Sequence, residues 1–100
     1  MMGYRIKVSG KSGAERVSGW PTSNPHIWVT RSLDDKSRFT VTHRSSGKAL
    51  AHNMETREMA DIAANVFAQF PIDWSADKPD PKNFKDVLID IRTAFNGHPR

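Results

Sequence analysis

The sequence contains no cysteine, so disulfide bonds and thiolate metal sites are excluded. It also lacks an apolar run of the roughly 20 residues that a transmembrane helix needs. The N-terminal segment does not pair a basic stretch with an apolar one of signal-peptide length. No internal repeat or low-complexity tract is present. We therefore expect a cytoplasmic protein without membrane contact.

The length of 100 residues suits one ordinary domain and is too short for two, so we expect residues 1–100 to form a single domain. Hydrophobic residues make up 37% of the chain and charged residues 26%, which is enough for one small core. This balance differs from that of a disordered chain, which is poorer in apolar residues.

Short alternating segments, rich in β-branched and aromatic residues, predict an N-terminal antiparallel sheet of four to five strands. Strands are expected at residues 4–8, 15–20, 27–33, 38–44 and 48–52. In the first of these, Tyr4, Ile6 and Val8 face one way, and Arg5 and Lys7 face the other. Turns rich in glycine, serine and aspartate separate the strands.

Two amphipathic helices are predicted to follow and to pack on one face of the sheet, which makes the fold class α+β. The first runs from about Thr56, its N-cap, to Phe70, and the second starts at Asp80-Pro81 and stops at Asn96-Gly97. The apolar stripes expected to face the core are Met59, Ile62, Ala63, Val66 and Phe70 in the first helix and Phe84, Val87, Leu88, Ile91 and Phe95 in the second.

Charge is distributed unevenly along the chain. Residues 1–52 carry nine Lys/Arg and three Asp/Glu, a net charge of +6, whereas residues 53–100 carry six and eight, a net charge of −2. A basic sheet half favours an anionic partner, either nucleic acid or an acidic protein surface. An unevenly charged but merely solvated surface is the competing interpretation.

Turn lengths predict how the later strands pair. A two-residue turn at Ser46-Gly47 would pair His43 with Leu50, and a four-residue loop at 34–37 would pair Thr30 with Val41. The face that includes Trp28, Phe39, Val41 and His43 would then be core. The opposite face would carry the predicted partner-binding residues, which are Arg31, Arg38, Arg44 and Lys48. A slip of one residue at either loop would exchange the two faces.

No catalytic, cofactor or metal signature is found. Ser9-Gly10-Lys11-Ser12 resembles the end of a phosphate-binding loop, but the required earlier glycine is replaced by Arg5. His43 and His52 could share a face as part of a metal site, yet no third ligand is evident, and structural strand histidines are the preferred interpretation. The tryptophans are expected in the core, with Trp20 as an alternative partner anchor.

The stretch from Phe39-Thr40-Val41-Thr42-His43 to Phe70-Pro71-Ile72-Asp73-Trp74 resembles segments of small proteins encoded by phages and integrative elements. The order of strands and helix is also similar to that of anti-CRISPR proteins and of the three-stranded DNA-binding domains of integrases. The resemblance implies a phage or mobile-element accessory protein, and it transfers no functional residues to this chain.

Three hypotheses about function follow. The first is a non-catalytic accessory or inhibitor protein that docks a host protein or ribonucleoprotein through its basic sheet face. The second is a small DNA-binding module that places the sheet in a groove of the duplex. The third, ranked last, is an enzyme that uses His43 or His52, because no nucleophile–base arrangement can be identified in the chain.

Overall fold

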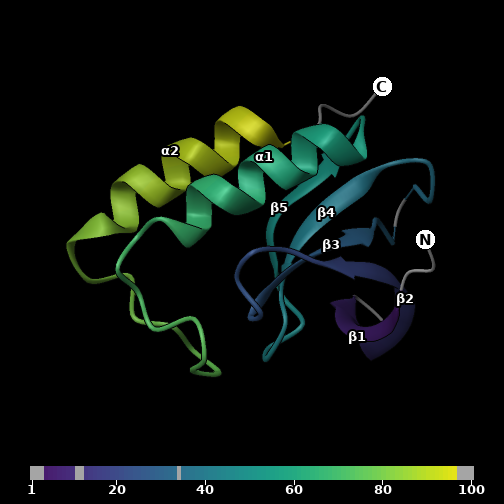
Figure 1. Ribbon diagram of the computed structural model, residues 1–100, viewed down its shortest axis with the longest axis horizontal. Coiled ribbons are helices and arrows are strands. Elements are labelled where there is room, and N and C mark those ends of the chain that lie inside the picture. The colour runs from purple at the N-terminus through teal and green to yellow at the C-terminus, as the bar shows by residue number, and fades with distance from the viewer. Residues whose placement is uncertain (1–3, 11–12, 34, 97–100) are drawn as a thin grey trace.

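The computed structural model describes residues 4–10, 13–33 and 35–96, and it confirms the α+β class. Five antiparallel strands are joined in sequence order, β1 Tyr4–Gly10, β2 Gly13–Pro21, β3 Ile27–Arg31, β4 Phe39–His43 and β5 Ala49–Met54. They are followed by α1 Arg57–Ala68, a 3₁₀ turn η1 Lys82–Phe84 and α2 Lys85–Phe95. The helices lie together on one side of the sheet, with α1 over β3 and β4 and α2 beside β5 (Figure 1). Neither helix in this described part of the chain is long and apolar enough to cross a bilayer.

Helix α1 begins as predicted but buries a different face. The Thr56 hydroxyl accepts a hydrogen bond from the Met59 backbone N–H at 3.1 Å, which confirms Thr56 as the N-cap. The buried residues are Ala60, Ala63, Ala64 and Phe67. Of the predicted stripe, Ala63 is buried and Phe70 packs against the core, as expected. Met59 and Ile62 remain 39% and 52% exposed, so the phase of the stripe is wrong. Three small alanines allow the helix backbone to approach the sheet closely, and this contact sets the rotation of the helix.

Helix α2 starts later than expected and packs more loosely. The Asp80 side chain accepts a hydrogen bond from the Lys82 N–H at 2.8 Å, but the turn that it caps is η1, and α2 begins only at Lys85. Leu88, Ile91 and Phe95 pack against the core as partly buried residues, whereas Val87 is exposed. The helix ends at Phe95, and the predicted stop residue Gly97 lies outside the described residues.

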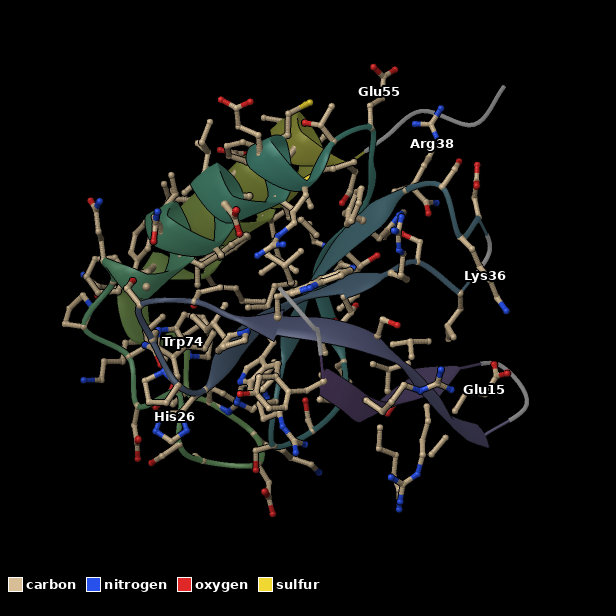
Figure 2. The ribbon with its side chains drawn as sticks, turned by 45° about the vertical axis from the view of Figure 1, so that its right-hand side comes forward. Glu15, His26, Lys36, Arg38, Glu55 and Trp74 are labelled. Carbon is tan, nitrogen blue, oxygen red and sulfur yellow. The ribbon has the colours of Figure 1, made fainter. Side chains whose placement is uncertain are left out.

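Both faces of the sheet bury apolar side chains. The main core lies under the helices and includes Ile27, Val29, Val41, Phe67 and Trp74. A second cluster lies on the other face, where Ile6, Val8 and Val17 of the β1–β2 hairpin pack against Trp28 and Leu33. The prediction that tryptophan is core holds for Trp74, which points inward on the side of the helices (Figure 2). Trp20 packs at the edge of the main core.

The predicted strand register is wrong by one residue. Thr30 pairs with Thr40, and Val29 pairs with Val41, so that Val29 rather than Trp28 faces the helices. The Ser32 N–H donates to the Arg38 carbonyl at 3.0 Å. The loop between β3 and β4 therefore spans five residues, 33–37, where four residues, 34–37, were expected. Irregularities between Phe39 and Thr42 shift the β4–β5 pairing as well. Each shift by one residue moves a strand's side chains to the opposite face.

The sheet curls until β1 contacts the turn between β4 and β5. The Ser9 N–H donates to the Gly47 carbonyl at 2.9 Å, and the Ser9 hydroxyl donates to the Ser46 carbonyl at 3.0 Å. This contact joins two segments that are far apart in the strand order. Gly47 permits it, because a Cβ at this position would lie 3.0 Å from the Ser9 nitrogen and 3.2 Å from the Lys7 carbonyl oxygen.

The substitution Gly47→Ala is therefore expected to destabilise the protein by about 1–3 kcal/mol. The residue has φ +73°, a conformation that strains a side chain, and the added methyl group would collide with the β1 backbone. Gly13→Ala is the matched control, because Gly13 also has positive φ but its Cβ would meet nothing within 4 Å. Urea unfolding of both variants tests the contact, and equal losses would contradict it.

Candidate functional site

The predicted arginines do not form one surface, because Arg31 and Arg44 point to opposite faces of the sheet. The Arg31 guanidinium lies 4.7 Å from the ring centroid of Phe39, which packs against the main core under the helices. The Arg44 guanidinium lies 5.6 Å from the ring of Trp28, which packs against the second cluster. The predicted single basic face is thus wrong, and the cause is the one-residue error in the β3–β4 register.

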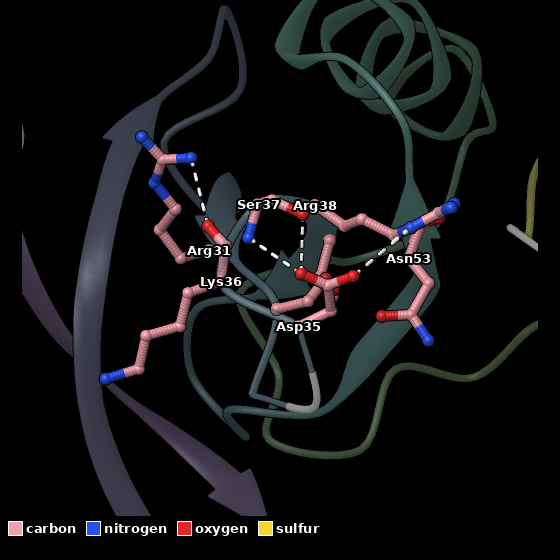
Figure 3. Close-up of polar contacts among 8 residues, drawn as sticks. Arg31, Asp35, Lys36, Ser37, Arg38 and Asn53 are labelled. Carbon is pink, nitrogen blue, oxygen red and sulfur yellow. Dashed lines mark hydrogen bonds and ion pairs between the residues drawn. The ribbon is translucent and has the colours of Figure 1, made fainter.

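Arg31 and Arg38 are engaged in local contacts around the β3–β4 loop (Figure 3). Arg31 donates to the Lys36 carbonyl at 3.1 Å, and Arg38 donates to the Asn53 carbonyl at 3.1 Å. Arg38 also forms an ion pair with Asp35 at 3.5 Å. Hydrogen bonds from Ser37, assisted by the charge of Arg38, lower the pKa of Asp35, so this carboxylate is ionised at neutral pH and offsets the charge of Arg38.

A different set of basic side chains converges on one groove of about 400 Å³. It lies where the β1–β2 hairpin meets the turn between β4 and β5, and we call it the basic groove. The residues that line it are Arg5, Lys7, Val8, Ser9, Ala14, Arg16, Arg44, Ser45, Ser46 and Gly47. Of the predicted partner-binding residues, the groove includes only Arg44 among the described residues, while Lys48 is exposed directly after Gly47.

Strand alternation explains why these side chains face outward. Ile6 and Val8 are buried in the second cluster. Arg5 and Lys7 alternate with them along β1, so their side chains face solvent. Lys7 pairs directly with Arg16, and Arg5 pairs with Ser18. Like charges that face each other across two strands destabilise a sheet. The Lys7–Arg16 pair is therefore a local cost in the free protein that a bound anion would remove.

Few carboxylates reduce the positive charge of the basic groove. Its described lining contains neither aspartate nor glutamate. Glu15 lies at the tip of the β1–β2 hairpin and points away from the molecule (Figure 2). The Asp77 carboxylate accepts a hydrogen bond from the hydroxyl of Ser45, which lines the groove. The hydroxyls of Ser9 and Ser45 already donate to the Ser46 carbonyl and to Asp77, so the four cationic side chains are the groups that the groove offers to an anion.

His43 has a structural role, in agreement with the preferred interpretation. It is 2% exposed, and its ring nitrogens lie 2.7 Å from the Ser46 hydroxyl and 2.6 Å from the Trp74 carbonyl. Because a carbonyl only accepts, Nε2 must donate to Trp74. The Ser46 hydroxyl also accepts the Lys48 N–H at 3.2 Å. These bonds hold the turn that lines the basic groove and engage both ring nitrogens of the buried imidazole.

His52 lies in different surroundings from His43. Its backbone N–H donates to the Asn96 side chain at 2.9 Å, and its Nδ1 is buried without a hydrogen-bond partner. Within residues 4–10, 13–33 and 35–96, no group of three potential metal-ligating side chains is found. His52 lines a hollow of about 380 Å³ whose walls include the hydrogen-bonded pair Thr30 and Thr42.

Sequence reasoning missed three of the four cations in the basic groove, although one signal for them was available. The alternation of β1 had already placed Arg5 and Lys7 on the solvent side. What it could not supply was the contact between β1 and residues 46–47, which brings Arg44 to the same groove. Comparisons with models of known protein families, with curated protein sequences and with solved structures found no match.

Proposed function

We propose that this protein is a non-catalytic domain that binds nucleic acid through the basic groove. The observation that carries the proposal is the convergence of Arg5, Lys7, Arg16 and Arg44 on one groove whose described lining holds no carboxylate. Guanidinium and ammonium groups in such an array neutralise a row of phosphates and release condensed counterions, which supplies most of the affinity for a nucleic-acid backbone.

Phosphate recognition unites two of the hypotheses from the sequence. A DNA-binding module and a protein that docks a ribonucleoprotein would use the same guanidinium–phosphate contacts. The groove differs from the predicted site in its residues, because Arg31 and Arg38 contact the β3–β4 loop and do not line the groove. The resemblance to phage and mobile-element proteins stays a prediction, since no comparison bears on it.

Titration of a fluorescently labelled oligonucleotide at about 50 and about 200 mM salt tests the proposal. Four phosphate contacts predict a slope of about −2.8 to −3.6 in a plot of log K against log salt, hence a loss of affinity of about 50- to 150-fold between the two conditions. Polyglutamate of similar length is the competitor that separates nucleic acid from an acidic protein. Absence of saturable binding, binding indifferent to salt, or stronger binding of polyglutamate would overturn the proposal.

A further inference from the structure

We infer that this protein carries a second binding site, a hollow beside α2 that takes a small carboxylate with an apolar body. The hollow has a volume of about 230 Å³ and is lined from β5, α1, α2 and the connector that joins the two helices (Figure 1). We call it the apolar hollow. The inference goes beyond the proposed function, because none of the residues described in the lining of the basic groove also lines this hollow.

The walls of the apolar hollow come from four segments of the chain. Leu50 belongs to β5, Phe67 to α1, Trp74 to the connector and Leu88 to α2. No described residue of α2 is buried, so this helix lies against the core without filling the space beside it. Ile89 also lines the hollow and is 50% exposed. An apolar molecule in the hollow would remove this side chain from water, which is favourable.

The connector gives its wall of the hollow little freedom to collapse. Pro79 and Pro81 both line the hollow, and the ring of a proline fixes its backbone angle φ. Trp74 is anchored at the other end of this wall, because the buried His43 ring donates to its carbonyl at 2.6 Å. The space beside α2 is therefore held open by the fold.

The charged groups that line the apolar hollow are two cations, Lys85 and Arg92, and its described lining contains neither aspartate nor glutamate. They lie about two helical turns apart on the same face of α2. Both are exposed, and neither forms an ion pair among the described residues. The helical period turns Asp86 and Asp90 to other faces of α2. An apolar interior beside two cations complements a ligand with an apolar body and one negative charge.

The volume of the hollow limits the size of the ligand. A water-sized group occupies about 30 Å³, so the hollow of about 230 Å³ has room for about eight such groups. Because a methylene group is of similar size, a carboxylate of about eight carbon atoms matches this space. Octanoate is therefore the probe that we choose. Its chain would contact the apolar walls, and its carboxylate would lie beside Lys85 and Arg92.

A competing explanation is that the hollow is only a gap in the packing of α2. A gap of this kind would bind apolar molecules regardless of their charge. A carboxylate site predicts a different order, in which octanoate binds more tightly than octanol and octylammonium binds most weakly. The charge of the head group, at constant chain length, therefore separates the two explanations.

The test follows the indole N–H resonance of Trp74 by NMR while ¹⁵N-labelled protein is titrated with each of the three probes. This group is a direct reporter, because Trp74 lines the hollow and its indole nitrogen is buried without a hydrogen-bond partner. The variant Trp74→Phe assigns the resonance. We expect octanoate to shift it saturably and to bind about 2- to 30-fold more tightly than octanol, the combined effect of two exposed charge pairs.

The double substitution Lys85→Gln and Arg92→Gln should remove this preference, with a loss of about 2- to 30-fold in affinity for octanoate and an unchanged affinity for octanol. Lys36→Gln with Lys78→Gln is the matched control, since both lysines are exposed and neither lines the hollow. The absence of a saturable shift of the Trp74 resonance with octanoate would overturn the inference. Equal affinities for octanoate and octanol, or equal losses in the two double variants, would overturn it as well.

Discussion

The double substitution Lys7→Glu and Arg16→Glu is expected to weaken nucleic-acid binding at about 50 mM salt by about 100-fold or more. Each phosphate contact that releases a counterion contributes about tenfold under these conditions, and two contacts are lost. The introduced carboxylates would also repel the phosphates. The slope of log K against log salt should become shallower by about 1.4 to 1.8. Fluorescence anisotropy measures both quantities.

The matched control is the double substitution Lys36→Glu and Lys85→Glu, which changes the net charge by the same amount. Both lysines are exposed, Lys36 in the β3–β4 loop and Lys85 at the start of α2, and neither lines the basic groove. Their reversal should have a much smaller effect on affinity and slope. If the two double variants lost affinity equally, the net charge of the protein rather than the groove would account for binding.

The substitution Phe67→Ala is expected to have the largest effect on stability, about 3–5 kcal/mol. The Phe67 ring is 2% exposed and lies in the main core under α1, so its removal leaves a cavity that the surrounding alanines cannot fill. A domain of this size has a total stability of about 5–15 kcal/mol, so the variant would be close to unfolding at physiological temperature. Thermal and urea unfolding measure the loss.

Met59→Ala is the control for Phe67→Ala because the periodicity of the sequence assigned Met59 to the core. Its exposed side chain should contribute little, so we expect its removal to cost less than about 1 kcal/mol. A loss for Met59→Ala as large as that for Phe67→Ala would show that α1 is rotated relative to the described packing.

Local patterns predicted the elements of this fold well, because they depend on neighbouring residues. Alternation in β1 predicted which side chains are outward, and the Thr56 cap predicted the start of α1. The phase of α1 was missed because methionine and isoleucine give a stronger apolar signal than alanine. The helix is instead rotated to the face where small side chains permit close contact with the sheet.

The basic groove was harder to predict because it depends on contacts between distant segments. A loop one residue longer than expected places Arg31 on the face under the helices, and no local propensity reveals that length. The groove itself forms only when Ser9 of β1 hydrogen-bonds to residues 46–47. Ser9 and Ser46 are 37 positions apart in the sequence. Arg5, Lys7 and Arg16 were therefore visible as exposed cations, but their convergence with Arg44 was not.

The most direct test of the account is to map the binding surface by NMR, with ¹⁵N-labelled protein titrated with oligothymidine. The account predicts that the amide chemical shifts of β1, β2 and residues 44–48 change together, while those of α1 and α2 stay unchanged. Changes confined to the helices, or to the β3–β4 loop around Arg38, would contradict it.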